Sequence, residues 1–418
     1  MNEIFSGKVA VIGLGYIGLP TAAALATRGI EVVGVDVNPE TVKAIVLGEA
    51  PFVEPDLAVA VSGAVAMGRL SATTETPQAD AYIIAVPTPF SDDLSADLSM
   101  VRSAVEQISP QLRGGEVVIL ESTCPPGTCR AMSEWIAALR PDLRLPHAGE
   151  GVSDIFVAHC PERVLPGRIM IEIVTNDRLI GGITPRCAEK AATIYRVFAQ
   201  GQLLLSDAAS AEMAKLVENS YRDVNIAFAN ELSLICEKLK LDIWEVIKLA
   251  NHHPRVNILS PGPGVGGHCI AVDPWFIVAA APELARLIRV AREVNDNKPS
   301  HVAHQVINKA GRFNAPAIAC LGLAFKANVD DLRESPAVKI VAQIAKSLPD
   351  VDVLVAEPFV DTLPRELVDL PNVRLVRTVD AVDAADIVVL LVEHDQFHSM
   401  NRSLLAGKVI YDTRGVWR

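Results

Sequence analysis

The chain has 418 residues, 50% of them hydrophobic, and a formal net charge of −12 at pH 7. A chain of this length exceeds one ordinary hydrophobic core, so two or three domains are expected. The acidic balance argues against a general nucleic-acid-binding protein, which needs excess lysine and arginine to neutralise phosphates. The apolar runs are shorter than the roughly 20 residues of a membrane helix, and the N-terminus does not resemble a signal peptide. We therefore expect a soluble cytoplasmic protein.

The first 120 residues alternate apolar strands with helices. Strands are expected at 8–15, 31–37, 79–89 and 116–123, and helices at 19–28, 39–47 and 100–112. This alternation is typical of a parallel sheet covered by helices on both faces. We predict a doubly wound, Rossmann-like domain over residues 1–200.

A glycine motif, "VIGLGYIG", follows the first of these strands and precedes a helix. Gly13 would allow the tight turn, Gly15 the approach of a pyrophosphate, and Gly18 the packing of helix on strand. Asp36 ends the next strand, where its carboxylate can bind a ribose diol and repel a 2′-phosphate, which favours NAD over NADP. A glycine turn needed only for packing remains the alternative. The expected cofactor contacts in the motif are Gly13, Gly15, Tyr16, Ile17 and Gly18.

Two more segments end strands of this domain, "VPTP" at 86–89 and "EST" at 121–123. In open α/β sheets the ligand binds at the carboxyl ends of the strands. Pro87, Thr88 and Thr123 are therefore candidates for contact with the cofactor or the reacting centre. The two threonines could equally be turn or helix-capping residues.

A long helix is predicted from Ser206 to Leu241. Its apolar positions occupy more than one face, so it needs several neighbours. We interpret it as a connector between domains that also contacts a second subunit, which predicts a homodimer. Lys215 and Asn219 lie four apart on it and would project from one face, as donors to a developing oxyanion or as part of a solvated surface.

Irregular loops are expected at about 141–170 and 252–275. Glu162, in the first loop, is a candidate general base, and an ion pair with Arg163 or Arg168 is the alternative. In the second loop, Cys269 follows a glycine run and precedes Asp273 by four residues. If a helix starts near His268, the thiol and the carboxylate share a face. A structural loop cysteine is the alternative interpretation of Cys269.

A thiol beside NAD has a chemical use. An aldehyde must become a tetrahedral adduct before it can give up hydride, and a cysteine forms this adduct as a thiohemiacetal. The 7 cysteines include no C-x-x-C pair, and no four ligands stand at a known zinc spacing, so no metal is expected.

Beyond Asn314 the early order of strands returns, in "AIACLGLAFK", "DVLVAEP", "ADIVVLLVEHD" and "KVIYDTRG". This weak internal repeat predicts a second Rossmann-like domain at 313–418, with a helical domain at 201–312 between the two. The predicted fold class is α/β, with two Rossmann-like doubly wound domains joined by a long central helix and a helical middle domain.

These motifs, with "ESTCPPGT", "CPERVLPG", "PGVGGHCIAVDPWF" and "LGLAFKANVDDLRESPA", resemble in order and over nearly the whole chain the family of nucleotide-sugar 6-dehydrogenases. The resemblance implies NAD-dependent, four-electron oxidation of a sugar C6 hydroxymethyl group to a carboxylate. It assigns Cys269 as the nucleophile, Glu162 to thioester hydrolysis, and Asp273, Lys215 and a water held by Thr123 to proton transfer. It adds Arg333 as a cofactor contact. The implied substrate contacts are Glu162, Arg163, Val164, Lys215, Asn219, Arg222, Arg255, Asn257, Gly266 and Lys326.

The residues around the cysteine bear on the sugar. Many members acting on UDP-glucose carry serine before it and "FQKD" after it, whereas this chain has His268 and "IAVD". The difference favours a UDP-N-acetylhexosamine, with UDP-N-acetyl-D-mannosamine expected for bacterial surface polysaccharide synthesis and UDP-N-acetylglucosamine or another UDP-hexose left open. His268 would tune the thiol or line the sugar pocket. A non-catalytic regulator and a two-electron hydroxyacid dehydrogenase are the alternatives from other classes.

Overall fold

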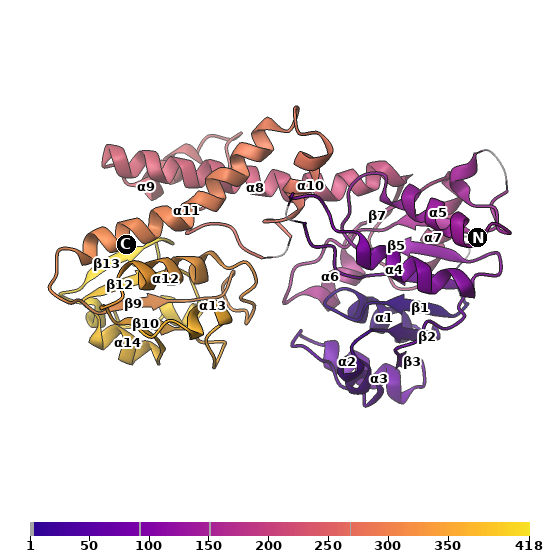
Figure 1. Cartoon of the computed structure of the whole chain (residues 1–418), viewed down its shortest axis with the longest axis horizontal. Helices are drawn as coiled ribbons and strands as arrows, with labels where there is room; N and C mark the ends of the chain where they lie inside the picture. Colours follow the sequence, from indigo (N-terminus) through magenta and orange to yellow (C-terminus); the bar gives the residue numbers. More distant parts are fainter. Residues whose placement is uncertain (1–3, 92, 150–151, 268) are drawn as a thin grey trace. The chain divides into compact units, whose positions relative to one another are not determined.

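The computed structural model describes residues 4–91, 93–149, 152–267 and 269–418. The chain divides into two compact units, Met1–Val217 and Glu218–Arg418, and helix α8 (Ala208–Leu239) contributes residues to both (Figure 1). His268 lies outside the described residues.

Within the described residues, the first unit is built on an eight-stranded sheet of order β3-β2-β1-β4-β5-β6-β7-β8. All neighbouring strands are parallel except β6 and β7, which are antiparallel. The order reverses between β1 and β4, which is where open sheets of this type bind ligands. The strands are β1 (Val9–Ile12), β2 (Val32–Val35), β3 (Leu70–Thr73), β4 (Ala81–Ile84), β5 (Val117–Leu120), β6 (Phe156–His159), β7 (Arg178–Gly182) and β8 (Leu203–Asp207).

Helices cover both faces of this sheet because its central strands are buried on both sides, as in the fully buried "VAVI" of β1. One face packs against α1 (Gly18–Ala26), α3 (Leu57–Ala66), α6 (Ile169–Thr175) and α7 (Pro185–Tyr195). The other packs against α4 (Ser99–Ile108) and α5 (Thr128–Leu139). Helix α2 (Pro39–Val46) follows β2, and short 3₁₀ turns occupy Ser109–Gln111 and Pro146–Ala148.

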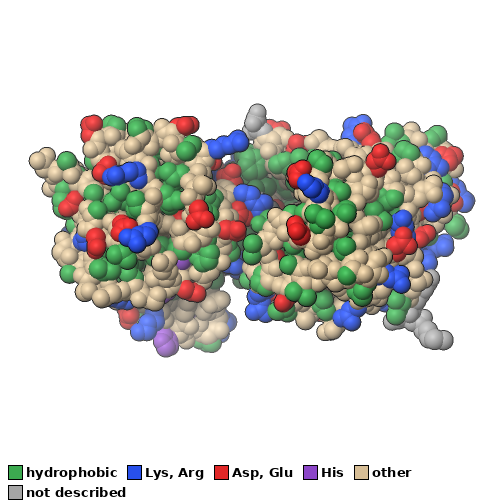
Figure 2. Space-filling model, turned by 90° about the horizontal axis from the view of Figure 1, so that it is seen from below, with side chains coloured by type: hydrophobic (Ala, Val, Ile, Leu, Met, Phe, Trp, Pro, Cys, Tyr) green, Lys and Arg blue, Asp and Glu red, His purple; other side chains and the backbone are tan. Residues whose placement is uncertain are grey.

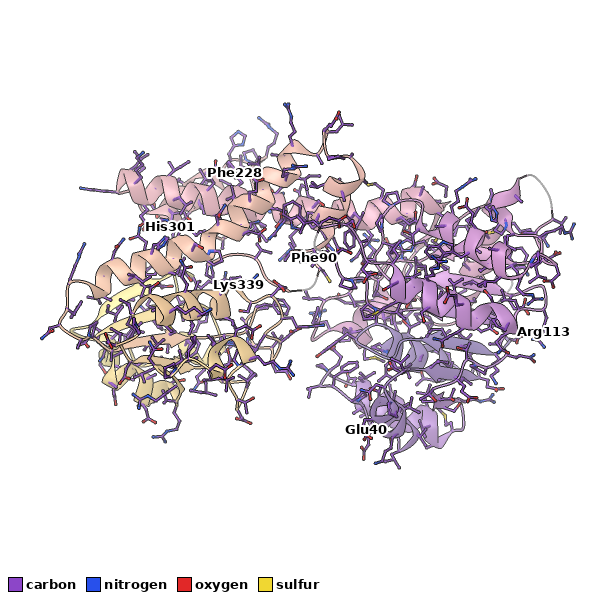
Figure 3. All side chains as sticks on the ribbon, in the orientation of Figure 1. Glu40, Phe90, Arg113, Phe228, His301 and Lys339 are labelled. Carbon is purple, nitrogen blue, oxygen red and sulfur yellow. The ribbon has the colours of Figure 1, made fainter. Side chains whose placement is uncertain are left out.

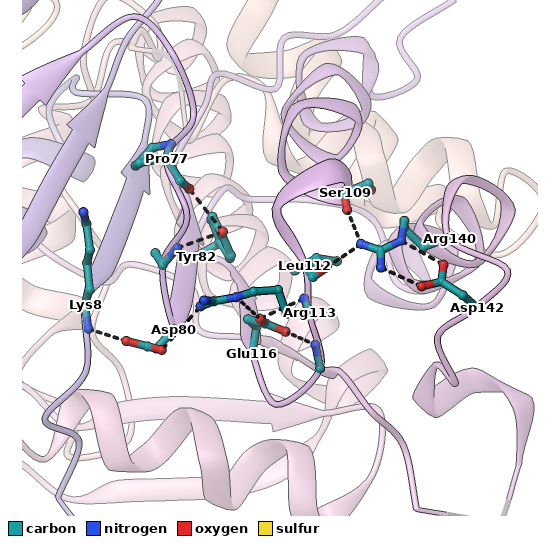
Figure 4. Close-up of polar contacts among 12 residues, drawn as sticks. Lys8, Pro77, Asp80, Tyr82, Ser109, Leu112, Arg113, Glu116, Arg140 and Asp142 are labelled. Atoms are coloured by element: carbon teal, nitrogen blue, oxygen red, sulfur yellow. Dashed lines mark hydrogen bonds and ion pairs between the residues drawn. The ribbon is translucent and has the colours of Figure 1, made fainter.

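Polar contacts close the amino-terminal edge of the same sheet (Figure 4). The Tyr82 hydroxyl accepts a hydrogen bond from the Ala79 N–H at 3.0 Å and donates to the Pro77 carbonyl at 3.2 Å. Arg140 donates to the carbonyls of Ser109 and Leu112. These bonds satisfy backbone groups of the loops that lead into the strands.

Helix α8 and three further helices, α9 (Ile243–Ala250), α10 (Asp273–Ala280) and α11 (Arg286–Ala310), form the middle of the chain. The second unit also holds, within the described residues, a five-stranded parallel sheet of order β11-β10-β9-β12-β13. Its strands are β9 (Ile318–Leu321), β10 (Val353–Ala356), β11 (Val373–Leu375), β12 (Ile387–Leu390) and β13 (Val409–Asp412). One face packs on α11, α12 (Pro336–Ser347) and α13 (Arg365–Val368), and the other on α14 (Thr378–Ala384), α15 (Asp395–His398) and the 3₁₀ turn Arg402–Leu405.

The predicted fold class is confirmed, and so is the internal repeat. The order β11-β10-β9-β12-β13 reproduces β3-β2-β1-β4-β5, with the reversal between β9 and β12 in place of β1 and β4. The long helix is shorter than predicted at both ends, because Ser206 and Asp207 belong to β8 and the helix ends at Leu239. Among the described helices, none combines the length and apolar character needed to cross a bilayer.

Two local predictions were wrong. The loop expected at 141–170 contains β6, whose four residues "FVAH" are too few to show a period in the sequence. The helix expected at 100–112 ends at Ile108 and is followed by the 3₁₀ turn Ser109–Gln111, which contains Pro110. On the face shown in Figure 2, acidic and basic side chains are interspersed on both units.

Candidate functional site

The glycine turn of the first unit lies between β1 and α1 at the reversal of strand order. Gly13 has φ +92°, and a Cβ there would lie 2.6 Å from the Ala85 carbonyl oxygen. A Cβ on Gly15 would meet nothing within 4 Å, so the backbone is open to a ligand at this position. A Cβ on Gly18 would lie 1.8 Å from the Gly13 oxygen, which requires glycine for packing. The turn therefore combines an open backbone with the N-terminus of α1, a favourable site for an anion.

Asp36 stands next to this turn, just beyond β2. Its Oδ2 accepts a hydrogen bond from the Leu14 N–H at 2.8 Å, and its Oδ1 accepts one from the Asn38 N–H at 2.9 Å. The half-exposed carboxylate keeps lone pairs on both oxygens for a ribose diol. Tyr16, in the same turn, stacks on Phe52 with ring centroids 4.3 Å apart, and Ile17 is the N-cap of α1. These residues fit the adenosine half of NAD.

The segments after β4 and β5 are tied to each other at the same edge. The Thr88 hydroxyl donates to the Thr123 carbonyl at 2.7 Å, and the Ser122 hydroxyl donates to the Val86 carbonyl at 2.6 Å. Thr88 is thus occupied as a donor, and Pro87 lies exposed beside it. Thr123 is half-buried, at the edge where ligands bind.

Glu212 attaches the start of helix α8 to the first unit. The Glu212 carboxylate is buried and accepts hydrogen bonds from the backbone N–H groups of Gly127 at 2.6 Å and Cys129 at 2.7 Å. These bonds hold the start of α8 against the N-terminus of α5. Lys215 lies one turn further along α8, half-buried. The ammonium also acts on His159 at the end of β6: burial, and to a lesser extent the charge of Lys215, lower the pKa of His159 to about 3.

Glu162 follows β6 and is held on both carboxylate oxygens. Oε1 accepts the Arg163 N–H at 2.7 Å, and Oε2 accepts Nη2 of Arg178 at 3.0 Å. The sequence suggested Arg163 or Arg168 as ion-pair partners; Arg168 instead pairs with Glu172 at 3.2 Å. Val164 packs against the core of the unit. The carboxylate is only 9% exposed, so it lies at the inner side of the edge rather than on the surface.

In the second unit, the glycine run before Cys269 is packed against the loop that follows β9. A Cβ on Gly266 would lie 2.7 Å from the Glu334 carbonyl oxygen. Gly267 has φ +83°, and its N–H donates to the Arg333 carbonyl at 3.1 Å. Gly266 thus permits a close backbone approach and Gly267 a positive φ, the two properties that a glycine supplies. The glycines of the loop 261–267 leave room for other parts of the unit, since a Cβ on Gly264 would lie 3.0 Å from a Pro299 side-chain atom and one on Gly267 3.0 Å from the Phe325 ring.

Cys269, Asp273 and Asn219 come together in the same unit. The Cys269 carbonyl accepts hydrogen bonds from the N–H groups of Val272 at 3.0 Å and Asp273 at 2.8 Å. The Asn219 amide donates to the buried Asp273 carboxylate at 2.5 Å. The condition of a helix beginning near residue 268 is not met, since α10 begins at Asp273 with Pro274 in its first turn. Cys269 is half-buried in the turn before that helix.

A buried polar network holds this arrangement. Arg292 on α11 pairs with Asp223 on α8 at 2.5 Å, and both are at most 1% exposed. Asn230 joins α8 to Asn295 of α11 at 2.8 Å and accepts the Gly262 N–H at 2.9 Å. The loop that carries the thiol is therefore anchored to the long helix before it reaches the glycine run.

The other predicted substrate residues are more open. Arg222 is exposed on α8, and Arg255 and Asn257 are exposed in the segment after α9. Asn251 ties that segment to α9, accepting the Ile258 N–H at 2.7 Å. Lys326 is half-buried, and Arg333 pairs with Asp331 at 2.6 Å. Arg333, expected at the cofactor, thus belongs to the loop that covers the glycine run of its own unit.

Sequence reasoning missed three groups of the first unit: Arg178, Glu121 and His159. Each is at most 3% exposed. The signal was present in part, because Arg178 opens an apolar strand and Glu121 closes one, both unusual places for a charge. The described residues hold no group of three or more histidine, cysteine, aspartate or glutamate side chains arranged to bind a metal ion.

The chain matches three family models in succession. These are the NAD binding domain of the UDP-glucose/GDP-mannose dehydrogenase family at residues 7–199, its central domain at 209–297 and its UDP binding domain at 319–418. The resemblance drawn from the motifs is confirmed.

Relatives match over the full length. The chain is 55% identical to an NDP-N-acetyl-D-galactosaminuronic acid dehydrogenase of Ralstonia nicotianae over 98% of this chain and 96% of that protein. It is 52% identical to the UDP-N-acetyl-D-mannosamine dehydrogenase of Escherichia coli over 98% and 99%. Among solved structures, a UDP-D-ManNAc dehydrogenase from Pyrococcus horikoshii matches with a TM-score of 0.87 at 38% identity, covering 98% of this chain and 96% of that one.

Proposed function

The chain belongs to the UDP-glucose/GDP-mannose dehydrogenase family and is an NAD-dependent nucleotide-sugar dehydrogenase, and on that premise we propose that it oxidises UDP-N-acetyl-D-mannosamine at C6 to the uronic acid. The reaction would consume one alcohol, two NAD⁺ and one water and give one carboxylate, two NADH and three protons. Bound NAD supplies the hydride acceptor for each oxidation. The product would serve bacterial surface polysaccharide synthesis.

The side chains of the protein would supply the oxyanion stabilisation, the proton transfers and the nucleophile. Lys215 and Asn219 would stabilise the alkoxide formed from the C6 hydroxyl, with Asp273, hydrogen-bonded to Asn219, and a water held by Thr123 sharing the protons. The Cys269 sulfur would attack the aldehyde to give a thiohemiacetal, whose oxidation leaves a thioester. Glu162 would then take a proton from the water that attacks the thioester carbonyl, and the thiolate of Cys269 would leave.

The observation that carries this proposal is the packing of the loop 261–267. Gly266 admits the Glu334 carbonyl, and the Arg333 carbonyl accepts the Gly267 N–H directly. The proposal is supported by the half-buried Cys269, which precedes by one turn the buried Asp273 whose carboxylate accepts the Asn219 amide. A cysteine with only a packing role needs none of these fixed polar neighbours.

Substrate identity has a second candidate. The 55% identity to an NDP-N-acetyl-D-galactosaminuronic acid dehydrogenase exceeds the 52% identity to a UDP-N-acetyl-D-mannosamine dehydrogenase. UDP-N-acetyl-D-galactosamine is therefore the alternative to test beside UDP-N-acetyl-D-mannosamine. Both sugars share the acetamido group that the residues around Cys269 favour.

The experiment that tests the chemistry is a count of NADH. With limiting UDP-N-acetyl-D-mannosamine, UDP-N-acetyl-D-galactosamine, UDP-N-acetyl-D-glucosamine or UDP-glucose, we expect two NADH per sugar consumed with the true substrate. One NADH per sugar would indicate a two-electron dehydrogenase, and none with the whole panel a non-catalytic regulator. Cys269→Ala should lose overall turnover by at least about 10³-fold while retaining nucleotide-sugar binding in calorimetry.

We also propose a homodimer that uses α8. Large apolar side chains of its second-unit part are exposed at intervals of seven and four residues: Tyr221 by 71%, Phe228 by 51%, Ile235 by 45% and Leu239 by 60% (Figure 3 labels Phe228). Such a stripe along one helix favours burial against a second copy. Phe228→Glu should convert the dimer to a monomer in light scattering, whereas Val379→Glu, at an exposed position of α14, should leave the mass unchanged.

Two further expectations belong to the same proposal. The functional domains are proposed at 1–200, 201–312 and 313–418, supported by family models that match 7–199, 209–297 and 319–418. A cytoplasmic location is proposed because a reactive thiol needs a reducing compartment.

A further inference from the structure

Three ionisable side chains of the first unit meet at the carboxyl ends of β5 and β6. Strand β7 runs antiparallel to β6, so its first residue, Arg178, lies at the edge where β6 ends. Arg178 Nη2 lies 3.0 Å from Oε2 of Glu162, and Nη1 lies 4.0 Å from Oε1 of Glu121. All three side chains are 9% exposed or less. The reversal of one strand thus places a guanidinium between two carboxyl groups at the ligand edge.

The guanidinium of Arg178 has little freedom to move. Nη2 also donates to the Ile173 carbonyl at 3.2 Å, and Nη1 donates to the Cys160 sulfur at 3.7 Å. Its carbon lies 4.8 Å from the ring centre of Tyr195 and 5.1 Å from that of Phe198. A planar group held from this many directions fixes the orientation of any carboxylate that it binds.

Glu121 is the second partner of the guanidinium. Oε1 accepts the Tyr195 hydroxyl at 2.8 Å, and Oε2 accepts the Thr21 hydroxyl of α1 at 3.0 Å. Burial, partly offset by Arg178 and reinforced by the charge of Glu162, raises the pKa of Glu121 to about 7.

The other titratable groups around Glu121 are the Tyr195 phenol on α7 and the Cys160 thiol after β6. Burial raises the pKa of both, that of Cys160 to about 12, so both are neutral at physiological pH. The charges at the cluster are therefore those of one guanidinium and two carboxyl groups. One guanidinium balances one carboxylate, so in a buried site the second carboxyl group is favoured in its protonated form.

We propose that Arg178 is a positioning residue that holds Glu162 in place for thioester hydrolysis, and that Glu121 controls this pairing by competing for the same guanidinium. The inference rests on the proposed function, in which Glu162 takes the proton of the attacking water. In that step the water oxygen bonds to the thioester carbon, the carbon–sulfur bond breaks, and the water proton goes to Glu162. Arg178 touches neither substrate nor cofactor in this scheme, and its effect passes through the carboxylate.

The experiment separates the oxidations from hydrolysis. In stopped-flow mixing of the enzyme with saturating NAD and nucleotide-sugar, an NADH burst reports the oxidations and the steady state reports hydrolysis. Arg178→Lys should keep the burst, lower the steady-state rate roughly 10- to 100-fold and leave KM for the sugar within about threefold. Intact mass spectrometry should find the sugar acyl adduct on Cys269, as in Glu162→Gln.

Arg140→Lys is the matched control. Like Arg178, Arg140 binds a carboxylate and backbone carbonyl oxygen, but at the opposite edge of the same sheet (Figure 4). It should leave the ratio of burst to steady-state rate unchanged. If the adduct accumulates in Glu162→Gln while Arg178→Lys behaves as wild type, the inference fails and the proposed function stands. If no adduct forms in any variant although acid is produced, the proposed function itself fails.

Glu121→Gln keeps Arg178 in place and tests the cluster if Arg178→Lys does not fold. Gln is neutral at every pH, so the competition for the guanidinium is removed. The steady-state rate of the wild type should change between pH 6 and 8, and Glu121→Gln should flatten this change by at least about threefold, with the burst unaffected. An unaltered pH profile in Glu121→Gln would overturn the role of Glu121.

Discussion

The two sheets repeat one topology but use the end of their first strand differently. In both, a glycine follows the strand with nearly the same backbone angle, φ +92° at Gly13 and +91° at Gly322. In both, the neighbouring central strand closes over that glycine: a Cβ on Gly13 would meet the Ala85 oxygen at 2.6 Å, and one on Gly322 would meet Cβ of Val392 at 2.4 Å. The repeat therefore preserves the turn itself.

The segments after the two turns differ. After Gly13, the open position Gly15 leads directly into α1, which starts at Gly18. After Gly322, the equivalent position is the buried Ala324, and the chain runs through a loop to α12, which starts at Pro336. Only the first turn offers a bare backbone and a helix N-terminus together. The second loop instead covers the glycine run before Cys269.

The carboxylates beside the two turns differ in the same sense. Asp36 receives one N–H bond on each oxygen. Glu357 is 8% exposed and receives bonds from Leu323, Ala324 and Phe359 N–H and from the His394 ring. The Asp36 carboxylate therefore keeps lone pairs for a ligand, whereas the Glu357 carboxylate holds the loop after β9 in place. A carboxylate with few internal donors keeps lone pairs for a ligand, whereas one with four donors is occupied by its own loop.

The largest loss of stability is expected from substitutions at the glycine that follows the first strand of each sheet. Gly13→Ala and Gly322→Ala should each destabilise their unit by about 3 kcal/mol or more, because a side chain at positive φ is strained and its Cβ overlaps a neighbour. Urea denaturation measures this effect. Gly15→Ala is the control, with no atom within 4 Å of the new Cβ. Equal stability of Gly13→Ala and Gly15→Ala would contradict the geometry.

The pH dependence of stability should have opposite signs for two buried glutamates. The pKa of Glu121 is raised from 4.5 to about 7, so the unfolded chain loses its proton first as pH rises. Glu121 should therefore cost stability on the order of 3 kcal/mol, developing between about pH 4.5 and 7. Burial alone would raise the pKa of Glu357, but the bonds from His394, Leu323 and Ala324 bring it below the usual value. Its contribution should be present above about pH 4.5 and lost on acidification.

Unfolding free energies of wild type, Glu121→Gln and Glu357→Gln from about pH 2.5 to 8 check both signs. The difference between wild type and Glu121→Gln should shift in favour of the variant as pH rises. The difference between wild type and Glu357→Gln should grow in favour of wild type. Slopes of the same sign would refute the distinction.

At neutral pH, Glu357→Gln should destabilise the second unit by about 2 kcal/mol, because backbone donors lose a buried charged acceptor. KM for NAD should not change. A rise in KM with no loss of stability would mean that Glu357 binds a ligand after all.

The smallest change in stability is expected from substitution of Asp36. Asp36→Ala should raise KM for NAD about tenfold through loss of the ribose contact, with little change in KM for the sugar. Stability should fall less than in Glu357→Gln, since each Asp36 oxygen serves only one internal donor. Equal weakening of cofactor and substrate would place the carboxylate elsewhere in the reaction.

The sequence by itself determined the two sheets, the glycine turn and the long helix, because these depend on local patterns. Buried parallel strands read as continuous apolar runs, and Gly13, Gly15 and Asp36 stand at spacings set by one strand–helix–strand unit.

Only the tertiary structure decided which side chains surround Glu162. Arg178 reaches it because β7 runs antiparallel to β6, and no periodicity in the sequence encodes that direction. Glu121 and Thr21 meet across 100 positions of the chain. Strand direction and such distant contacts follow from how whole layers of helices and strands pack on one another. A charged side chain can be buried only where this packing brings it a partner of opposite charge from a distant part of the chain.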